Sequence, residues 1–273
     1  MLEGDCRPLS YDDILEDDIK NQILVNPELV SYLGKLGDTA VVYEKTLPIY
    51  SNRVIADALM FTENKGVISF EIKTGHDNLK RLPHQLDAYA RCCNYNFVFC
   101  EDKQLKGVQE ILKHKKYYHV GIITYEEFDH KVIAGLYKQA EPSPYFSLRA
   151  LAGILWKKEL YSILNTYVSR QDLLIANTYN LKKQGSLHDS RFSHRTGNGN
   201  VNRSMNKGQL LNIYTKFFDD FQGTKIICET FIQENFSPEK QLVLYKAGRD
   251  KKYIPGDIAF KVPFDYHKHR YKK

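Results

Sequence analysis

The stretch FEIKTGHDNLKRLPHQLDAY, from Phe70 to Tyr89, joins a short apolar segment to a polar segment with helical spacing. Its first residues belong to VISFEIKT, from Val67 to Thr74, which predicts a buried strand that nevertheless carries Glu71 and Lys73. Burying a charge without a partner is costly, so two charges in one short buried strand point to a functional site.

A helix is predicted directly after this strand. The helical stretch begins at Asp77, and its apolar stripe consists of Leu79, Leu82, Leu86 and Tyr89. Pro83 lies inside the pattern, where a first-turn position makes its missing N–H harmless, so the regular helix is expected to start near Leu82.

The rest of the first half also alternates signals of strands and helices. Helical segments are predicted from Ser10 to about Gln22, from Glu28 to Leu36 and from Gly107 to His114. Further strands are predicted at Ala40–Tyr43, ending near Glu44, and at Arg53–Phe61, Asn96–Cys100 and His119–Thr124, with a hairpin turn at Glu63–Gly66. This order predicts an α/β fold with a mixed sheet flanked by helices.

The second half has the pattern of a mostly helical region. We expect an α/β domain over residues 1–140, a linker at Glu141–Pro144 and a helical region over residues 147–273. Helices are predicted from Ser147 to about Asn165, from Ser169 to about Lys183, and over Leu210–Phe221. Residues 184–207, rich in Gly, Ser, Asn, His and Arg, predict a flexible loop.

Composition narrows the class of protein. The chain has 273 residues and a formal net charge of +6, which is compatible with a polyanionic partner but does not require one. The five cysteines are an odd number without a C-x-x-C pair, so a disulfide framework and a zinc finger are not supported. Without a signal-peptide pattern or a long apolar stretch, we expect a soluble cytoplasmic protein with no membrane contact.

The two charges of the opening strand predict a cation site. Residues i and i+2 of a strand face the same side, so Glu71 and Lys73 project together about 7 Å apart at the backbone. The predicted hairpin brings Asp57 beside Glu71, and two close carboxylates are tolerated when a divalent cation lies between them. Hard oxygen ligands, with the carbonyl of Ile72 as a further one, favour Mg²⁺ or Mn²⁺. Lys73 would orient a water that the metal activates, or stabilise negative charge on phosphorus oxygens.

Taken alone, a Glu-x-Lys pair is weak evidence, because it is often a solvated pair on an exposed strand or helix. The wider pattern is more specific. The set R-x-x-x-D, then F-E-I-K-x-x-x-D-x-L-x-R-L-P-x-Q-x-x-x-Y, then a short apolar strand, resembles the PD-(D/E)XK, or restriction-endonuclease-like, phosphodiesterases, in particular a branch of small bacterial and phage proteins. The matching positions are Arg53, Asp57, Glu71, Lys73, Asp77, Leu79, Arg81, Leu82, Pro83, Gln85 and Tyr89. The resemblance covers roughly residues 40–101, with one departure: Ala56 stands where the family name has proline.

The resemblance implies a role for each matching side chain. Asp57 and Glu71 would be metal ligands and Lys73 the catalytic lysine, on a restriction-endonuclease-like core. Glu44 matches a position where such folds often supply another carboxylate, although a surface glutamate before a loop explains it equally well. Gln85, on the helix, would bond to a metal-bound water or a phosphate, whereas Tyr89 is expected to be a core ring.

Arginines supply the predicted contacts with nucleic acid. Those expected to contact phosphates are Arg53, Arg81, Arg191, Arg195 and Arg203. Arg81 has a second interpretation, a structural salt bridge with Asp77, and the loop arginines could equally belong to a solvated segment.

The function predicted from these residues is metal-dependent hydrolysis of phosphodiester bonds, in DNA rather than RNA. A catalytically silent nucleic-acid-binding module is the first alternative. A regulatory protein is the second, with a protein partner or a second copy bound through the helical region.

Overall fold

The computed structural model describes residue 19 and residues 27–48, 54–128, 131–167, 201 and 203–235, together with strand segments at 243–246, 249–253 and 260–261. The helices predicted at Ser10–Gln22 and Ser169–Lys183 lie outside the described residues, apart from Ile19, which is helical.

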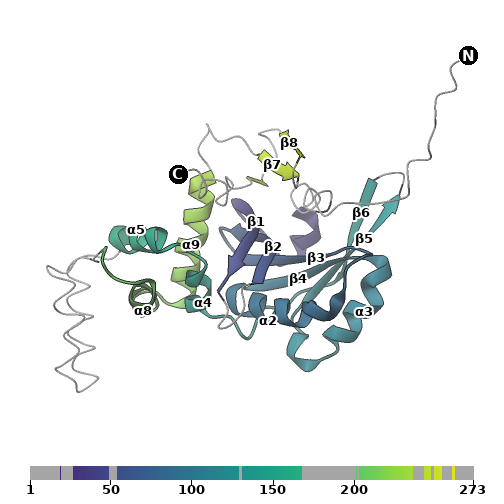
Figure 1. The fold of residues 1–273 in the computed structure, drawn as a ribbon, viewed down its shortest axis with the longest axis horizontal. Coiled ribbons are helices and arrows are strands. Elements are labelled where there is room, and N and C mark those ends of the chain that lie inside the picture. Colours follow the sequence, from purple (N-terminus) through teal and green to yellow (C-terminus); the bar gives the residue numbers. More distant parts are fainter. Residues whose placement is uncertain are drawn as a thin grey trace, which may run out of the picture.

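The architecture is a mixed sheet with helices packed against it, which confirms the predicted α/β fold (Figure 1). The strand order is β6-β5-β4-β3-β2-β1-β9. The strands are β1 (Thr39–Leu47), β2 (Val54–Thr62), β3 (Gly66–Lys73), β4 (Tyr95–Glu101), β5 (Gly121–Phe128), β6 (Lys131–Lys138) and β9 (Phe260–Lys261). The central strands β3, β4 and β5 are parallel, and the β1–β2, β2–β3 and β5–β6 pairs are antiparallel. A separate hairpin is formed by β7 (Val243–Lys246) and β8 (Arg249–Tyr253).

The predicted hairpin turn between β2 and β3 is present. Gly66 has a φ of +76°, in the left-handed region that glycine adopts without steric cost. A Cβ at this position would lie 2.2 Å from the Oδ1 atom of Asn94, an oxygen that accepts a hydrogen bond from the Val67 N–H. The turn therefore requires glycine for its backbone conformation and for its close contact with Asn94.

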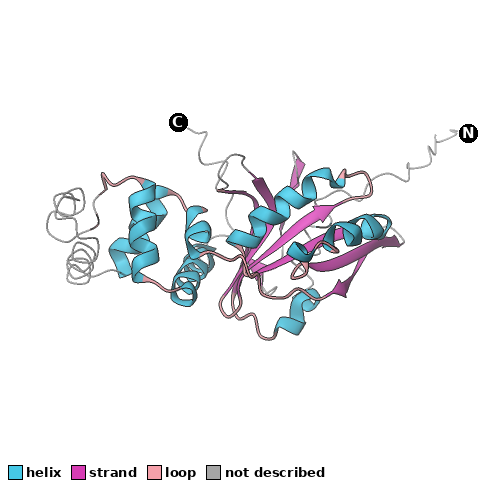
Figure 2. Cartoon of the chain, turned by 90° about the horizontal axis from the view of Figure 1, so that it is seen from below, coloured by secondary structure: helices cyan, strands magenta, loops and turns pink. Residues whose placement is uncertain are grey.

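The helices connect these strands and extend the fold beyond them. The helices between β3 and β4 are η2 (Leu79–Arg81) and α2 (Leu82–Cys92), and those between β4 and β5 are α3 (Asp102–Leu112) and η3 (Lys115–Tyr117). The others are η1 (Pro27–Leu33), α4 (Leu148–Gly153), α5 (Lys157–Tyr167), α8 (Lys207–Phe217) and α9 (Asp220–Asn235). Figure 2 shows α4, α5, α8 and α9 gathered at one end of the sheet.

Two apolar clusters cover the two faces of the sheet. The cluster called here the helical-face core contains residues of the sheet and of α2, α4, α5, α8 and α9, among them Phe61, Tyr89 and Phe231. The second cluster includes Val30 of η1 with Ile68 and Phe70 of β3. Because the helical-face core joins residues from both predicted regions, the sheet and the C-terminal helices bury one continuous apolar surface.

Several boundaries differ from the predictions for local reasons. The helix predicted over Ser147–Asn165 is divided into α4 and α5, because the Glu159 carboxylate accepts a 2.6 Å hydrogen bond from the Trp156 N–H and caps a new helix. The helix predicted over Leu210–Phe221 is likewise divided into α8 and α9, where Asp219 accepts a 2.7 Å bond from the Gln222 N–H.

The end of the predicted flexible loop also differs from expectation. Val201 and Met205 are buried in the helical-face core, so this part of residues 184–207 is packed.

In the N-terminal half, β1 continues through Glu44 to Leu47, and β6, which pairs with β5 as a hairpin, was not predicted.

The described cysteines are buried free thiols: Cys92, Cys93, Cys100 and Cys228. Burial raises the pKa of Cys92 to about 12, so the thiol stays protonated and unreactive at neutral pH. Among the described helices, none has the length and hydropathy needed to cross a bilayer.

His119, just before β5, is a fully buried ring, and among the described residues its two nitrogens have no partner that meets hydrogen-bond geometry. The rings of Tyr118 and Tyr145 pack against it edge-on, each with a centroid distance of 5.8 Å. Burial lowers the pKa of His119 below its ordinary value of 6.5, and the charge of Lys138 lowers it further.

This burial predicts acid-sensitive folding. As the pH falls through 6.5, His119 takes up a proton more readily in the unfolded chain than in the folded one. The free energy of unfolding therefore keeps its full value above that pH and decreases below it. His119→Phe should raise the free energy of unfolding by about 1 kcal/mol, because it removes two unsatisfied nitrogens, and should reduce the loss of stability below pH 6.5. Urea unfolding at several pH values measures both effects, with His84→Phe, at an exposed position, as the control. An unchanged pH profile in His119→Phe would contradict this account.

Candidate functional site

Asp57 lies where β2 and β3 separate. The pairing of the two strands ends at Ala58 and Phe70, and beyond it the Asp57 Oδ2 atom accepts a 2.8 Å hydrogen bond from the Ile72 N–H. Leu59 and Ala56 are three residues apart yet both belong to the helical-face core, whereas a regular strand would place them on opposite faces. The strand is therefore irregular at this point, and the half-buried carboxylate of Asp57 replaces β2 as the partner of the β3 backbone.

Glu71 and Lys73 project from β3 on the side that α2 covers. Glu71 is fully buried and Lys73 is 5% exposed. The Lys73 Nζ atom donates a short hydrogen bond to Glu71 Oε1 and a 3.2 Å bond to the carbonyl oxygen of Ile72. The buried charges are thus paired and hydrogen-bonded, the condition under which a protein interior tolerates them.

Tyr89 completes the cluster, and its role exceeds the one predicted for it. The ring lies in the helical-face core as expected, but its hydroxyl donates a short hydrogen bond to Glu71 Oε2 and accepts a 3.3 Å bond from the Asp57 N–H. Burial raises the pKa of Tyr89 well above its ordinary value, and the charges of Glu71 and Asp57 raise it further. The hydroxyl therefore remains a donor at any physiological pH and connects the two acidic residues.

Gln85 lies one helical turn before Tyr89 on the same face of α2. Its side chain is 8% exposed, and its Oε1 atom has no hydrogen-bond partner within the described part of the chain. A buried carbonyl oxygen without a donor is costly, so this atom is suited to accept from a bound water or substrate or to ligate a cation.

Glu44 shares the irregularity that positions Asp57. It falls between the Tyr43–Ala58 and Lys45–Ala56 pairs of the β1–β2 ladder, in register with Asp57, and its φ of +52° is rare for a residue with a side chain. The side chain of Glu44 is exposed. The prediction that β1 ends near Glu44 is therefore wrong, because this unusual conformation occurs within the strand rather than after it.

The predicted arginines are not gathered at this cluster. Arg81 is exposed at the end of η2 and forms no ion pair with Asp77, whose Oδ2 atom accepts from the Thr74 N–H at 2.6 Å and from the Thr74 hydroxyl at 2.8 Å. Arg203 lies near the start of α8, with its guanidinium 5.7 Å from the centre of the Tyr161 ring. Arg53, Arg191 and Arg195 lie outside the described residues.

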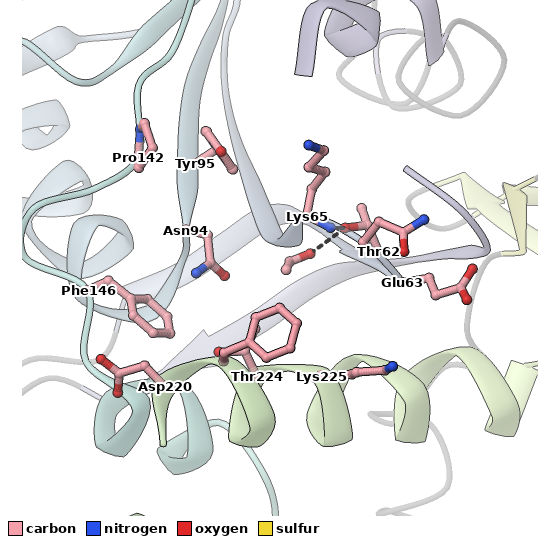
Figure 3. A pocket seen from close by; sticks show the side chains of 13 residues that line it. Thr62, Glu63, Lys65, Asn94, Tyr95, Pro142, Phe146, Asp220, Thr224 and Lys225 are labelled. Carbon is pink, nitrogen blue, oxygen red and sulfur yellow. Dashed lines mark hydrogen bonds between the residues drawn. The ribbon is translucent and has the colours of Figure 1, made fainter. Parts of the chain in front are cut away.

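A pocket of about 390 Å³ lies at the opposite end of β3 (Figure 3). It is lined by the β2–β3 turn, by Asn94 and Phe146, and by Thr224 in the first turns of α9. None of the predicted site residues that the structure describes lines it. This pocket is therefore separate from the cluster of Asp57, Glu71, Lys73 and Tyr89.

The oxygen atoms of the cluster fit a hard cation with few protein ligands. Asp57, Glu71 and the Ile72 carbonyl are all oxygen donors, and Gln85 adds an unpartnered one. No group of three or more His, Cys, Asp or Glu side chains with metal-site geometry occurs among the described residues, so a cation here would keep several waters, as Mg²⁺ does. The Lys73 ammonium already contacts two of these oxygens, so this position accepts positive charge.

The Tyr89 hydroxyl should stabilise the fold measurably. Tyr89→Phe leaves the ring in the core but removes a donor to a buried carboxylate, so the free energy of unfolding should fall by about 1–3 kcal/mol. Tyr117→Phe is the matched control, because the Tyr117 hydroxyl makes longer bonds, to Pro83 at 3.2 Å and to a partly exposed Asp87 at 3.1 Å. Denaturant unfolding measures the free energy of unfolding of both variants. An equal decrease in the two would show that the bond to Glu71 stabilises the fold no more than an ordinary hydroxyl bond does.

The comparison with known proteins gives one match. The family model described as Bacteriophage P4 protein cII matches residues 10–194, which contain the strands β1 to β6 and the whole Asp57–Glu71–Lys73–Tyr89 cluster. No curated protein and no solved structure matches the chain. Because the match spans more than half of the 273 residues, the chain belongs to the Bacteriophage P4 protein cII family.

Proposed function

We propose that this phage-family protein is a metal-dependent nuclease of the PD-(D/E)XK type that hydrolyses phosphodiester bonds of DNA. The observation that carries the proposal is that Asp57, Glu71 and Lys73 meet where β2 and β3 separate: Asp57 accepts from the Ile72 N–H, and Lys73 bonds to Glu71 and to the Ile72 carbonyl. Glu71 and Lys73 face the same side as the Tyr89 hydroxyl, which bonds to both Glu71 and the Asp57 backbone.

Each residue of the cluster has a distinct task in this proposal. When bound, a divalent cation supplies Lewis-acid polarisation of the phosphate and a lowered pKa for a water molecule. Asp57 and Glu71 would hold that cation together with the Ile72 carbonyl, and Gln85 would accept a hydrogen bond from a cation-bound water. Lys73 would place its ammonium beside the phosphate oxygens on which negative charge develops.

The position of Lys73 determines how a cation would enter. Its ammonium contacts Glu71 Oε1 and the Ile72 carbonyl, two of the oxygens that the proposal assigns to the cation. Cation binding therefore requires Lys73 to move off at least one of them, toward the place where it would meet the phosphate.

A non-catalytic nucleic-acid-binding module is the second candidate, and one observation favours it. Glu71 is fully buried and accepts hydrogen bonds on both carboxylate oxygens, which is also how a structural buried glutamate is satisfied. In that case the cluster would stabilise the separated β2 and β3 strands, and the chain would bind nucleic acid without cleaving it.

Cleavage assays separate the two functions. The full chain should cleave DNA with Mg²⁺ or Mn²⁺ but not with EDTA, and Asp57→Asn, Glu71→Gln and Lys73→Met should each lower the rate by about 100-fold or more. Single-stranded DNA, duplex DNA and RNA are compared as substrates, and unfolding curves confirm that each variant is folded. Glu110→Gln, at an exposed position on α3, is the control, and Glu44→Gln tests whether that carboxylate takes part. Binding without cleavage would favour the silent module, whereas cleavage that survives in all three site variants would refute the proposed site.

Cation binding can be measured without any substrate. Lys73→Met should tighten Mn²⁺ binding about tenfold or more, because it removes a competing positive charge from the ligand oxygens. Lys103→Met is the matched control, since Lys103 bonds to Glu101 at 2.8 Å with a side chain that is 84% exposed. Titration followed by the electron paramagnetic resonance of free Mn²⁺ gives the dissociation constants. Equal effects of the two substitutions would show that Lys73 does not occupy the cation position.

A further inference from the structure

We propose that a basic surface formed by η2, α3 and η3 binds the phosphate backbone of a nucleic acid and leads it to the Asp57–Glu71–Lys73 cluster. The basic surface is defined by four exposed cations, Lys80, Arg81, Lys106 and Lys115. This inference rests on the proposed function, because it assigns the substrate-binding surface of the same site.

The elements that carry these cations pack against one another. A Cβ at Gly107 of α3 would lie 2.7 Å from the Leu79 side chain, so η2 and α3 are in close contact next to Lys106 and Lys80. At η3, the Tyr117 hydroxyl donates to the Pro83 carbonyl, so the element that carries Lys115 is joined to the start of α2, directly after Arg81. Figure 1 shows α2 and α3 on the same side of the sheet, and both contribute to the helical-face core.

The charges on this surface are unequally satisfied. Three of its acidic side chains form ion pairs with lysines: Asp87 with Lys116, Glu101 with Lys103, and Glu110 with Lys113. Two more, Asp77 and Asp102, are exposed and form no ion pair among the described residues, although Asp77 accepts hydrogen bonds from Thr74. Within the described part of the chain, by contrast, no ion pair or side-chain hydrogen bond engages Lys80, Arg81, Lys106 or Lys115. The four unpaired cations outnumber these two carboxylates, so the surface keeps an excess of positive charge for a polyanion.

The basic surface is joined directly to the candidate site. The loop that follows Lys73 is held by Gln104 of α3, whose Nε2 atom lies 3.2 Å from the carbonyl oxygens of Thr74 and Gly75 and 3.0 Å from that of Asp77. Lys80 and Arg81 follow this loop, and Lys106 lies two residues after Gln104. A backbone bound by the four cations would thus lie beside the end of β3 that carries Glu71 and Lys73.

The chemistry of the surface indicates what kind of contact it makes. Exposed lysine and arginine side chains bind phosphates mainly through release of condensed counterions, which gives a strong dependence on salt and little dependence on sequence. The surface therefore fits the backbone of a nucleic acid rather than its base edges.

The test is a salt series on a four-site variant. Lys80→Gln, Arg81→Gln, Lys106→Gln and Lys115→Gln are combined, and the control combines Lys35→Gln, Lys158→Gln, Lys216→Gln and Lys225→Gln, four exposed lysines outside η2, α3 and η3 that give the same loss of charge. Fluorescence anisotropy measures binding of a labelled oligonucleotide in EDTA, which prevents metal-dependent cleavage. Between about 50 and 200 mM salt, the first variant should reduce the slope of log K against log salt by about 3, and its affinity should fall at least about tenfold. The control should change the slope by less than about 1.

The outcomes distinguish this surface from the nuclease proposal. Binding that depends on the four cations, in a protein that does not cleave, would support the surface and refute the nuclease. Metal-dependent cleavage with an unchanged salt slope in the four-site variant would support the nuclease and overturn the surface. An equal loss in the control variant, or no binding by the unmodified chain at low salt, would also overturn the surface.

Discussion

The fold is organised around a buried carboxylate that cannot be left without partners. Glu71 lies at full burial on the central strand β3, and the Lys73 ammonium and the Tyr89 hydroxyl satisfy its two oxygens. This requirement fixes α2 against β3, because Tyr89 must reach across to the strand. It also involves β2, whose Asp57 contacts both Tyr89 and the β3 backbone. Removing Lys73 would leave the buried Glu71 charge without a counter-ion, and removing the Tyr89 hydroxyl would leave one of its oxygens without a donor, so the cluster couples the packing of three elements.

Much of this arrangement could be predicted from sequence. The alternation of Glu71 and Lys73 with apolar residues, the turn residues at Glu63–Gly66 and the helical stripe ending at Tyr89 each identified a local element correctly. Local signals succeed here because strand alternation, glycine at a turn and proline in the first turn depend on neighbouring residues alone.

Two of the errors concern Glu44 and Tyr89, whose outcome depends on distant residues. Nothing near Glu44 in the sequence indicates a left-handed conformation inside a strand, because it accompanies the separation of β2 from β3. Tyr89 was expected to be only a core ring, since a helical apolar stripe does not reveal which hydroxyl will meet a buried acid. The division of α8 from α9 carried a local signal, the Asp219 cap, which an apolar repeat running through it concealed. The family match places the chain with a phage protein, and the chemistry proposed for it rests on the cluster itself.

The packing of α9 has a consequence for how the chain is made. Phe231 of α9 stacks on Phe61 of β2 with ring centroids 4.0 Å apart, although the two residues are separated by most of the chain. During synthesis, β1, β2 and β3 emerge from the ribosome long before the helix that covers them. The nascent sheet therefore exposes an apolar face until α9 has been made, a state in which chaperones would be expected to bind. Completion of the native core in this sense waits for a helix that is made well after the sheet.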